Sequence, residues 1–394
     1  MIFQTLDSKN ECVGYYTDGK LHFDEEPSSL SKTWAYAPYL DDSVAYASLY
    51  TKGKKLGESC PEHLKEDYIR SSQKLKSYFR SFQMAKIDLN SICFFDLVPQ
   101  RFLLEYYDIR NKITNHVFEN YDEPSNYDFL VELTKISYDI KFRKLNVDYS
   151  KFSSFSNSEK TKAFHKKLRK TVPYIDYNIF GTVTGRLTVS RDSFPILTFP
   201  KSYRKVLKPN NDRFVEFDFN AAELRTLLSL SGNKQPKEDI HEWIVKNVFN
   251  NSITREESKT KTFAWLYNPE AENTRLERLF NKNKLVDKYW KDGQVTTPFG
   301  RIMKCDRKHA LNYLIQSTTS DMFLCQMIEV NKLLKNKKSY ISFCMHDSLV
   351  IDFGVEDRDL ISDLHNLFSQ TKLGLYKTNI SLGRDYGTMR KMDL

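Results

Sequence analysis

Residues 213–230 read RFVEFDFNAAELRTLLSL, and their pattern changes midway from that of a strand to that of a helix. The largely apolar run 214–217 predicts a short buried strand that ends at Asp218. The segment 221–230 has the composition of a helix, and Gly232 is the kind of residue that commonly ends one. A carboxylate therefore stands where a strand ends and a helix departs. A lone aspartate at such a position is most often a helix N-cap, so a chemical role for it requires a partner.

The partner is predicted within residues 340–353, YISFCMHDSLVIDF. Apolar residues alternate on both sides of His346 and Asp347, which predicts a hairpin with the aspartate at its tip. Two aspartates brought side by side repel one another unless divalent cations lie between them. Oxygen-only ligands suit Mg²⁺, which keeps waters and substrate phosphates as its other ligands. Two such ions about 4 Å apart can activate an attacking oxygen and stabilise the leaving one in phosphoryl transfer.

A third pattern lies in residues 255–267, REESKTKTFAWLY. Arg255, Lys259, Phe263 and Tyr267 are evenly spaced, so on a helix they line one face about 18 Å long. Cations suit a triphosphate, and aromatic rings suit a stacked base or sugar. The alternative is an ordinary amphipathic helix with cations on its surface and aromatic residues in the core.

Taken in order along the chain, these segments resemble the motifs of the family A DNA polymerases, the group of bacterial DNA polymerase I and many phage replicases. The resemblance runs from about Pro99 to the C-terminus. DFNAAELR at 218–225 and MHDSLV at 345–350 are similar to the two catalytic motifs of that family, and 255–267 is similar to its nucleotide-binding fingers helix. TVTGRLT at 182–188 is similar to the family's T-x-T-G-R-L signature, which contacts the primer–template near its end.

The resemblance implies a two-metal nucleotidyl-transfer site. The metal ligands would be Asp218, Asp347 and the backbone of Phe219, with two Mg²⁺ ions for which Mn²⁺ could substitute. The catalytic residues would be Asp218, Asp347 and Lys259. The nucleotide-binding residues would be Arg255, Lys259, Phe263, Tyr267, His241 in EDIHEW, and Glu223 as the residue that discriminates the sugar. The residues that contact DNA or the nascent pair would be Arg186, Thr184, Asn312 and Gln316.

Physical reasoning supports several of these roles. Lys259 and Arg255 can neutralise charge on the β- and γ-phosphates, where a positioned cation stabilises the transition state. Glu223 follows Asp218 closely enough in the sequence to share its pocket, and its bulk under the sugar would exclude a 2′-hydroxyl. Rotation of the 255–267 helix could then close the site on a matched base pair.

Residues 160–170, KTKAFHKKLRK, contain six Lys or Arg. We expect four of them, Lys166, Lys167, Arg169 and Lys170, to bind DNA phosphates, so that affinity falls with salt. The alternative is a solvated basic face. The net charge of +9 permits a polyanionic partner but does not require one.

The sequence also departs from the family pattern. Ser348 stands where the family usually has Glu, so we expect activity to survive with altered metal behaviour. Ala221 replaces a commoner Gln, and Ala264 and Asn268 stand where glycines are usual in the fingers helix. The segment between residues 299–301 and Asn312 is short, as in phage-type members of the family. Too little sequence precedes the helical segment for the family's 3′–5′ exonuclease domain, so we expect no proofreading within this polypeptide.

The expected fold is α+β, a right hand of palm, fingers and thumb with a small N-terminal region. Residues 1–92 form that region, and an exonuclease remnant is one interpretation of it. Two long predicted helices would pair as an antiparallel hairpin within a thumb of residues 93–165. The palm takes 166–240 and 296–394, and the fingers take 241–295.

Composition excludes other classes of protein. No long uninterrupted apolar run predicts a membrane-spanning helix, and the N-terminus lacks the pattern of a signal peptide. The six cysteines lack CxxC spacing, which argues against a zinc site or a disulfide framework and fits a reducing cytosol. We therefore expect a cytoplasmic protein, in the bacterial host if phage-encoded, whose partners are primer–template DNA and dNTPs. A separate exonuclease, a processivity factor or a helicase–primase would be further partners.

Two other functions remain open at this point. A single-subunit RNA polymerase shares the expected fold, although Glu223 and the TGRL segment argue against it. A non-catalytic DNA-binding subunit derived from a polymerase is the second alternative. Asp218, Asp347 and Lys259 argue against that alternative, because a binding module has no use for a pair of metal-binding carboxylates.

Overall fold

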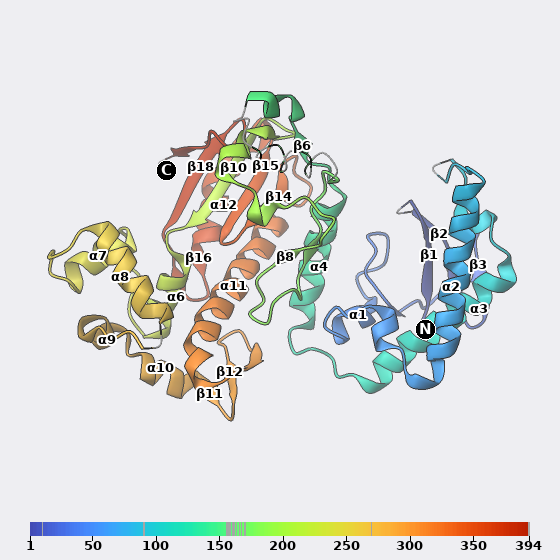
Figure 1. Cartoon of the computed structure of the whole chain (residues 1–394), viewed down its shortest axis with the longest axis horizontal. Helices are drawn as coiled ribbons and strands as arrows, with labels where there is room; N and C mark the ends of the chain where they lie inside the picture. Colours follow the sequence, from blue (N-terminus) through green and yellow to red (C-terminus); the bar gives the residue numbers. More distant parts are fainter. Residues whose placement is uncertain are drawn as a thin grey trace. The chain divides into compact units, whose positions relative to one another are not determined.

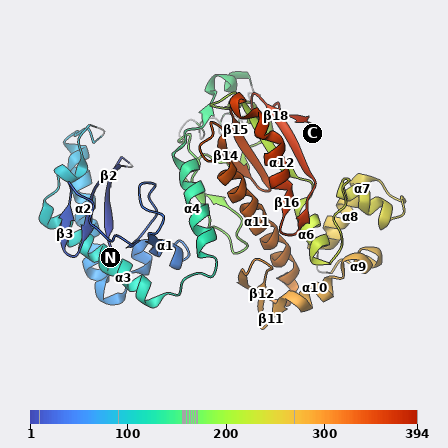
Figure 2. The same cartoon turned by 180° about the vertical axis from the view of Figure 1, so that it is seen from behind.

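The computed structural model describes residues 1–9, 11–89, 91–154, 171–268 and 270–392, together with Glu159, Lys162, Phe164, Lys166 and Leu168. Contacts between residues divide the chain into two compact units, Met1–Val131 and Glu132–Leu394, and each is described by itself (Figures 1 and 2). Among the described residues, no helix combines the length and the apolar composition that a membrane span needs.

The first unit joins a small antiparallel sheet to several helices. The sheet has the order β1-β2-β3, formed by Gln4–Ser8, Glu11–Thr17 and Lys20–His22. The helices are α1 (Ala47–Tyr50), α2 (Glu62–Met84) and α3 (Gln100–Asn120). Shorter elements are the parallel pair β4 (Lys32–Thr33) and β5 (Ala45–Tyr46) and the 3-10 helices η1 (Leu56–Ser59) and η2 (Phe94–Asp96). Side chains from β2, α2 and α3 share one core, which includes Tyr16, Phe102 and Leu103.

The two long helices predicted for residues 93–165 both form, as α3 and α4 (Tyr127–Phe142), but they do not belong to one unit. α3 packs on α2 in the first unit, whereas α4 crosses the boundary after Val131. The boundary that contacts give therefore differs from the one predicted after residue 92. The sequence of α3 shows that the helix buries an apolar face, but it does not show which other helix packs against that face. A thumb of residues 93–165 remains a prediction.

A five-stranded antiparallel sheet forms the centre of the second unit. Its order is β14-β15-β10-β18-β19, formed by Tyr340–Met345, Ser348–Phe353, Arg213–Phe219, Thr378–Gly383 and Arg390–Met392. The helices of this unit are α6 (Ala222–Leu230), α7 (Ile240–Asn247), α8 (Arg255–Tyr267), α9 (Thr274–Phe280), α10 (Lys282–Tyr289), α11 (Arg307–Leu333) and α12 (Ile361–Ser369), together with most of α4.

The two faces of the central strand β10 differ in character. Phe217 and Phe219 are buried on one face, and Phe219 stacks on Phe368 of α12 with ring centroids 4.3 Å apart. Glu216 and Asp218 are only partly buried, and alternation along a strand turns them to the opposite face. The aromatic core therefore fixes which face of the sheet presents the carboxylates.

Helices α7 to α10 gather beside α6 and the first turns of α11, as both views show (Figures 1 and 2). Side chains from α6 through α11 form one core, in which Leu224, Trp265 and Phe280 are buried. This helical group is thus attached to the sheet through α6, the helix that directly follows β10.

Short elements complete the second unit. A three-stranded sheet is formed by β11 (Trp290–Lys291), β12 (Gln294–Thr296) and β13 (Ile302–Lys304). Two-stranded pairs are β6 (Asn146–Val147) with β9 (Leu207–Lys208), β7 (Tyr177–Asn178) with β8 (Thr188–Val189), and β16 (Gln370–Thr371) with β17 (Gly374–Leu375). The 3-10 helices are η3 (Tyr149–Ser154), η4 (Ile196–Thr198), η5 (Lys201–Val206) and η6 (Val355–Leu360).

The predicted strand, hairpin and helices around the three motifs are confirmed. β10 and α6 match the strand and helix predicted around Asp218, and α8 matches the helix predicted for 255–267. Thr254 begins α8 with a capping box: its hydroxyl accepts the amide of Glu257 at 3.3 Å, and the Glu257 carboxylate accepts the Thr254 amide at 2.8 Å. Gly232 follows α6 with a left-handed φ of 78°, the conformation that commonly ends a helix.

We predict that Phe217→Ala lowers the free energy of unfolding of the second unit by about 3–5 kcal/mol, because the ring is fully buried and its loss leaves a cavity. Urea titration followed by tryptophan fluorescence measures this loss. Val355→Ala, at a side chain that is 57% exposed in the same unit, serves as the control and should change stability by less than about 0.5 kcal/mol. Equal losses in both variants would contradict the placement of the core.

Candidate active site

Strand pairing brings Asp218 and Asp347 to the same edge of the sheet. β10 and β15 are antiparallel, and Asp218 is the direct partner of Ser348. Asp347 immediately precedes Ser348, in the turn between β14 and β15, so it lies beside Asp218. The predicted hairpin with Asp347 at its tip is therefore confirmed. Its turn needs a left-handed residue, and His346 supplies it with a φ of 58°.

The two carboxyl groups perturb one another. Burial raises the pKa of Asp218 to about 7, and the negative charges of Asp347 and Glu216 add to the shift. Burial also raises the pKa of Asp347, against the opposing influence of His346 and Arg186. The only side-chain hydrogen bond to Asp218 is a long one of 3.5 Å from Asn379 Nδ2, among the residues that the structure describes. The pair is thus partly buried, with little compensation from the protein for the lost contact with water.

Glu216 is a third carboxylate near this pair, and the sequence analysis missed it. Its Oε1 accepts hydrogen bonds from Ser348 Oγ and from Tyr386 Oη, each at 3.1 Å. Ser348, which departs from the family pattern, thus contacts a carboxylate on the neighbouring strand. The two-residue spacing of Glu216 and Asp218 was the available signal, because residues so spaced share one face of a strand.

A cavity of about 480 Å³ adjoins the turn and is lined by Asp347, Glu223, Arg186 and Phe263, among others. The residues come from the β14–β15 turn, α6, the loop before β8, and α8. Four separate motifs of the sequence therefore meet around one space, as expected for a common site.

The TGRL loop places Arg186 against Glu223. Gly185 has a φ of 78°, and a Cβ there would lie 2.5 Å from the guanidinium of Arg301, so the loop requires glycine. Arg301 is itself fixed by an ion pair with Asp321, at 2.6 Å. Arg186 Nη2 forms an ion pair with Glu223 Oε1. Burial raises the pKa of Glu223, and Arg186 opposes that shift. Two residues with different predicted roles are thus direct partners.

The predicted stripe on α8 runs from the surface to the edge of the helical core, against which Phe263 and Tyr267 pack. Trp265 and Leu266 of the same helix are buried in that core, whereas Lys259 is exposed and Phe263 and Tyr267 are partly exposed. The rings of Phe263 and Tyr267 are nearly parallel, with centroids 5.9 Å apart. Both rings are partly exposed and also pack against the core, so the alternative of an amphipathic helix with core aromatic residues remains open.

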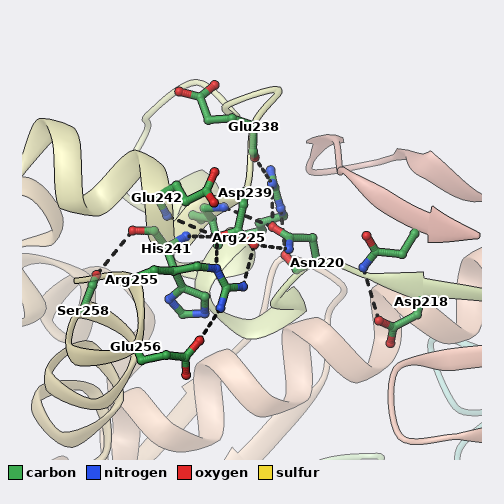
Figure 3. Close-up of polar contacts among 12 residues, drawn as sticks. Asp218, Asn220, Arg225, Glu238, Asp239, His241, Glu242, Arg255, Glu256 and Ser258 are labelled. Carbon is green, nitrogen blue, oxygen red and sulfur yellow. Dashed lines mark hydrogen bonds and ion pairs between the residues drawn. The ribbon is translucent and has the colours of Figure 1, made fainter. Parts of the chain in front are cut away.

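Arg255, the first residue of the stripe, is bound to Asp239 (Figure 3). Its Nε and Nη2 donate to the two Asp239 carboxylate oxygens at 3.2 and 2.8 Å. Asp239 also accepts from Asn220 Nδ2 at 2.8 Å. Burial alone would raise the pKa of Asp239, but the hydrogen bonds from Arg255 and Asn220 hold it well below its usual value. This ion pair was not predicted.

His241 follows Asp239 in α7 and is 2% exposed. Burial lowers its pKa, and its Nδ1 has no hydrogen-bond partner among the described residues. Its ring lies 5.7 Å from that of Phe263, centroid to centroid. The predicted histidine therefore sits against the stripe as a neutral imidazole rather than as a surface cation.

The predicted DNA-contacting residues are spread over several elements. Thr184 is buried in the TGRL loop. Asn312 and Gln316 are half-buried on α11, and Asn312 lines a second cavity of about 370 Å³ whose wall includes Lys282. Lys166 is exposed. The other three basic residues of that segment, Lys167, Arg169 and Lys170, lie outside the described residues.

Phe219, whose backbone was predicted to bind metal, ends β10 and pairs with Thr378 of β18. Its side chain is buried, so only its backbone is near the carboxylate edge. No group of three or more His, Cys, Asp or Glu side chains with metal-holding geometry occurs among the described residues. Among the described residues, no third His, Cys, Asp or Glu side chain therefore joins Asp218 and Asp347 in a metal-holding group.

The Asp218 carboxyl predicts a pH dependence of stability in the absence of divalent cations. Its folded-state pKa of about 7 lies above the value of an unfolded aspartate, so the folded protein binds the proton more tightly. Stability should therefore fall as pH rises from about 4 to 7, by roughly 3–4 kcal/mol from this group. Asp218→Asn should remove most of that slope and be more stable than the wild type at pH 8. Denaturant unfolding in chelator at several pH values measures it.

Asp359→Asn is the matched control, because the Asp359 side chain is 93% exposed. It should keep the pH slope of the wild type. An unchanged slope in Asp218→Asn would show that the carboxylates are not partly buried as described.

The fold of the chain is similar to a solved structure, the POL domain of Pol1 from M. smegmatis in complex with DNA primer-template and dNTP. The TM-score is 0.57 at 12% sequence identity, and the similarity covers 73% of this chain and 76% of that chain. No family model matches the sequence, and no curated protein matches it. The likeness establishes that this mixed arrangement of helices and strands resembles a polymerase domain.

Proposed function

We propose that this chain is a template-directed DNA polymerase that extends a primer 3′ end with dNTPs by two-metal-ion nucleotidyl transfer. The observation that carries the proposal is the meeting of Asp218 and Asp347 at one sheet edge, beside a cavity lined by residues of two other motifs. The similarity of fold to a polymerase domain bound to primer-template and dNTP supports the same conclusion.

The donor set at the sheet edge fits Mg²⁺. Asp218 and Asp347 offer only oxygen atoms, which hard divalent cations prefer, and Mn²⁺ could substitute. Burial raises the pKa of both carboxyl groups, and bound cations would favour their charged forms. The backbone of Phe219 would add a ligand from the end of β10. When bound, two such ions supply charge neutralisation and activation of the attacking hydroxyl.

The residues around the cavity would bind the nucleotide and the primer end. Lys259 is exposed on α8 and would neutralise the triphosphate, while Phe263 and Tyr267 would lie against the sugar and the base. Glu223 would limit the space under the sugar. Arg186, its ion-pair partner, would reach the primer terminus from the TGRL loop.

The wider assignments follow from the same proposal. The sheet that carries the aspartates would be the palm, within 166–240 and 296–394, and helices within 241–295 would be the fingers. Thr184, Asn312, Gln316 and the basic residues from Lys166 to Lys170 would contact DNA. Residues within 93–165 would form the thumb. The proposed activity is primer extension without excision of mismatched primer ends.

The central test is primer extension with Mg²⁺ on a primed DNA template. Asp347→Asn should lower extension by at least about 1,000-fold, because the metal site loses a charged ligand, while DNA affinity changes less than about 3-fold. Asp363→Asn, at an exposed carboxylate of α12, is the control and should extend like the wild type. Persistent extension by Asp347→Asn would refute the mechanism, and loss of a mismatched primer end would contradict the absence of excision.

Sugar selection gives a second test, which separates this function from RNA polymerisation. The wild type should strongly prefer dNTPs, and Glu223→Ala should reduce the ratio of kcat/KM for dNTP over rNTP by at least about 10-fold. The measurement is single-nucleotide addition with each triphosphate offered alone. A wild-type preference for ribonucleotides, or an unchanged ratio in the variant, would overturn the assignment of Glu223.

A further inference from the structure

Each of the three nitrogens of the Arg255 guanidinium donates to a carboxylate of the protein. Two of its nitrogens donate to Asp239, and Nη1 donates to Glu256 at 2.7 Å. Lys259, one turn further along α8, is exposed and has no ion pair among the described residues. The two cations of the stripe are therefore not equivalent: Arg255 already pairs with two carboxylates and keeps only part of its donors for a ligand, whereas Lys259 has no ion-pair partner among the described residues.

Asp239 faces three elements at once (Figure 3). It receives Arg255 from α8, and it caps α7 by accepting the backbone amides of His241 and Glu242 at 3.0 and 3.1 Å. It also accepts from Asn220, which directly follows β10. The capping role is common for an aspartate, but the contacts with Arg255 and Asn220 are independent of it.

Asn220 is held as firmly as Asp239. Its Oδ1 accepts from the Ile240 amide at 3.1 Å and from Arg225 Nη2 at 3.0 Å. Arg225 is 0% exposed, and its Nε donates to the Asn220 carbonyl at 2.8 Å. Its remaining donors bind the carbonyls of Pro236 and Glu238 at 2.9 and 2.8 Å. A buried arginine thus fixes both the backbone and the side chain of the residue that leaves β10.

The contacts form one continuous path from the first turn of α8 to the end of the strand that carries Asp218. Arg255 binds Asp239, Asp239 binds Asn220, and Asn220 is two positions beyond Asp218. Charge-assisted hydrogen bonds in a partly buried setting are strong and directional. Movement at the start of α8 must therefore either break the ion pair or displace the loop that follows the strand.

We infer that Asp239 is a positioning residue that couples α8 to the end of β10, with Arg255 acting through it, and that Lys259 makes the direct charge contact with the triphosphate. The inference rests on the proposed function and divides the roles of the two cations. Loss of the coupling should misplace the reacting groups without removing a phosphate ligand, so it should lower kcat and leave the KM for dNTP nearly unchanged.

The kinetic test uses single-nucleotide extension over a range of dNTP concentrations. Asp239→Asn keeps a side chain that caps helices well and removes the charge that holds Arg255. It should lower kcat by at least about 10-fold with KM changed less than about 3-fold. Arg255→Ala should do the same, and the double variant should be no slower than the slower single variant, because one path is broken in each. Lys259→Ala should raise KM by at least about 10-fold.

Glu256→Gln is the matched control, because it removes the exposed partner of the same guanidinium and leaves Asp239 in place. It should keep kcat and KM within about 2-fold of the wild type. A lower KM in Asp239→Asn would overturn the inference, since it would mean that Asp239 merely withholds Arg255 from the triphosphate. A rise in KM for Arg255→Ala as large as that for Lys259→Ala would overturn it too.

Hydrogen–deuterium exchange tests the coupling without nucleotide, DNA or activity. Asp239→Asn and Arg255→Ala should speed exchange of the amides at 219–222 by at least about 10-fold, and Glu256→Gln should not. Unchanged exchange in both variants would overturn the coupling. Failure of the wild type to extend any primer would refute the proposed function instead, and the exchange result would still decide whether the path exists.

Discussion

Two partly buried carboxylates held side by side are the constraint on which the candidate site depends. Asp218 and Asp347 come from distant parts of the sequence, and only the antiparallel pairing of β10 with β15 brings them together. Their burial, and in second place the negative charge of their neighbours, costs free energy, as the raised pKa of Asp218 shows. Apolar burial elsewhere in the same sheet, where Phe217 and Phe219 pack under the strand, offsets this free-energy cost.

The chemistry-bearing edge is connected to its surroundings by polar contacts rather than by packing alone. Ser348 and Tyr386 hold Glu216 on one side of Asp218. Asn220 leads from the strand to Asp239 on the other. The side chains that would react are thus surrounded by groups whose positions are fixed by two or more hydrogen bonds, which is the arrangement that a preorganised site requires.

The local elements could be predicted from the sequence because their signals are local. Alternation around His346, the change of period after Asp218, and the four-residue spacing within 255–267 each lie within the element that they define or beside it. The partners of α3 could not be predicted, since an amphipathic helix shows that it buries a face but not against what. The bond between Arg255 and Asp239 was missed for a similar reason, because it depends on how the loop before α7 folds back.

The roles of the site residues remain predictions, whereas the fold is similar to a polymerase domain at 12% identity. At so low an identity, periodicity and a few spaced polar residues preserve more of the architecture than residue identity does.

The alternation along β10 also limits how this sequence can change in length. The residues from Phe214 to Asp218 are paired on both sides, and Phe217 and Phe219 occupy the face opposite to Glu216 and Asp218. A one-residue insertion or deletion inside the strand would turn Glu216 and Asp218 towards the ring of Phe368 and point phenylalanines at the solvent edge. A substitution changes one side chain, whereas a one-residue shift of register along β10 exchanges the two faces of the strand. Length variation compatible with this arrangement is therefore confined to the connections outside the strand.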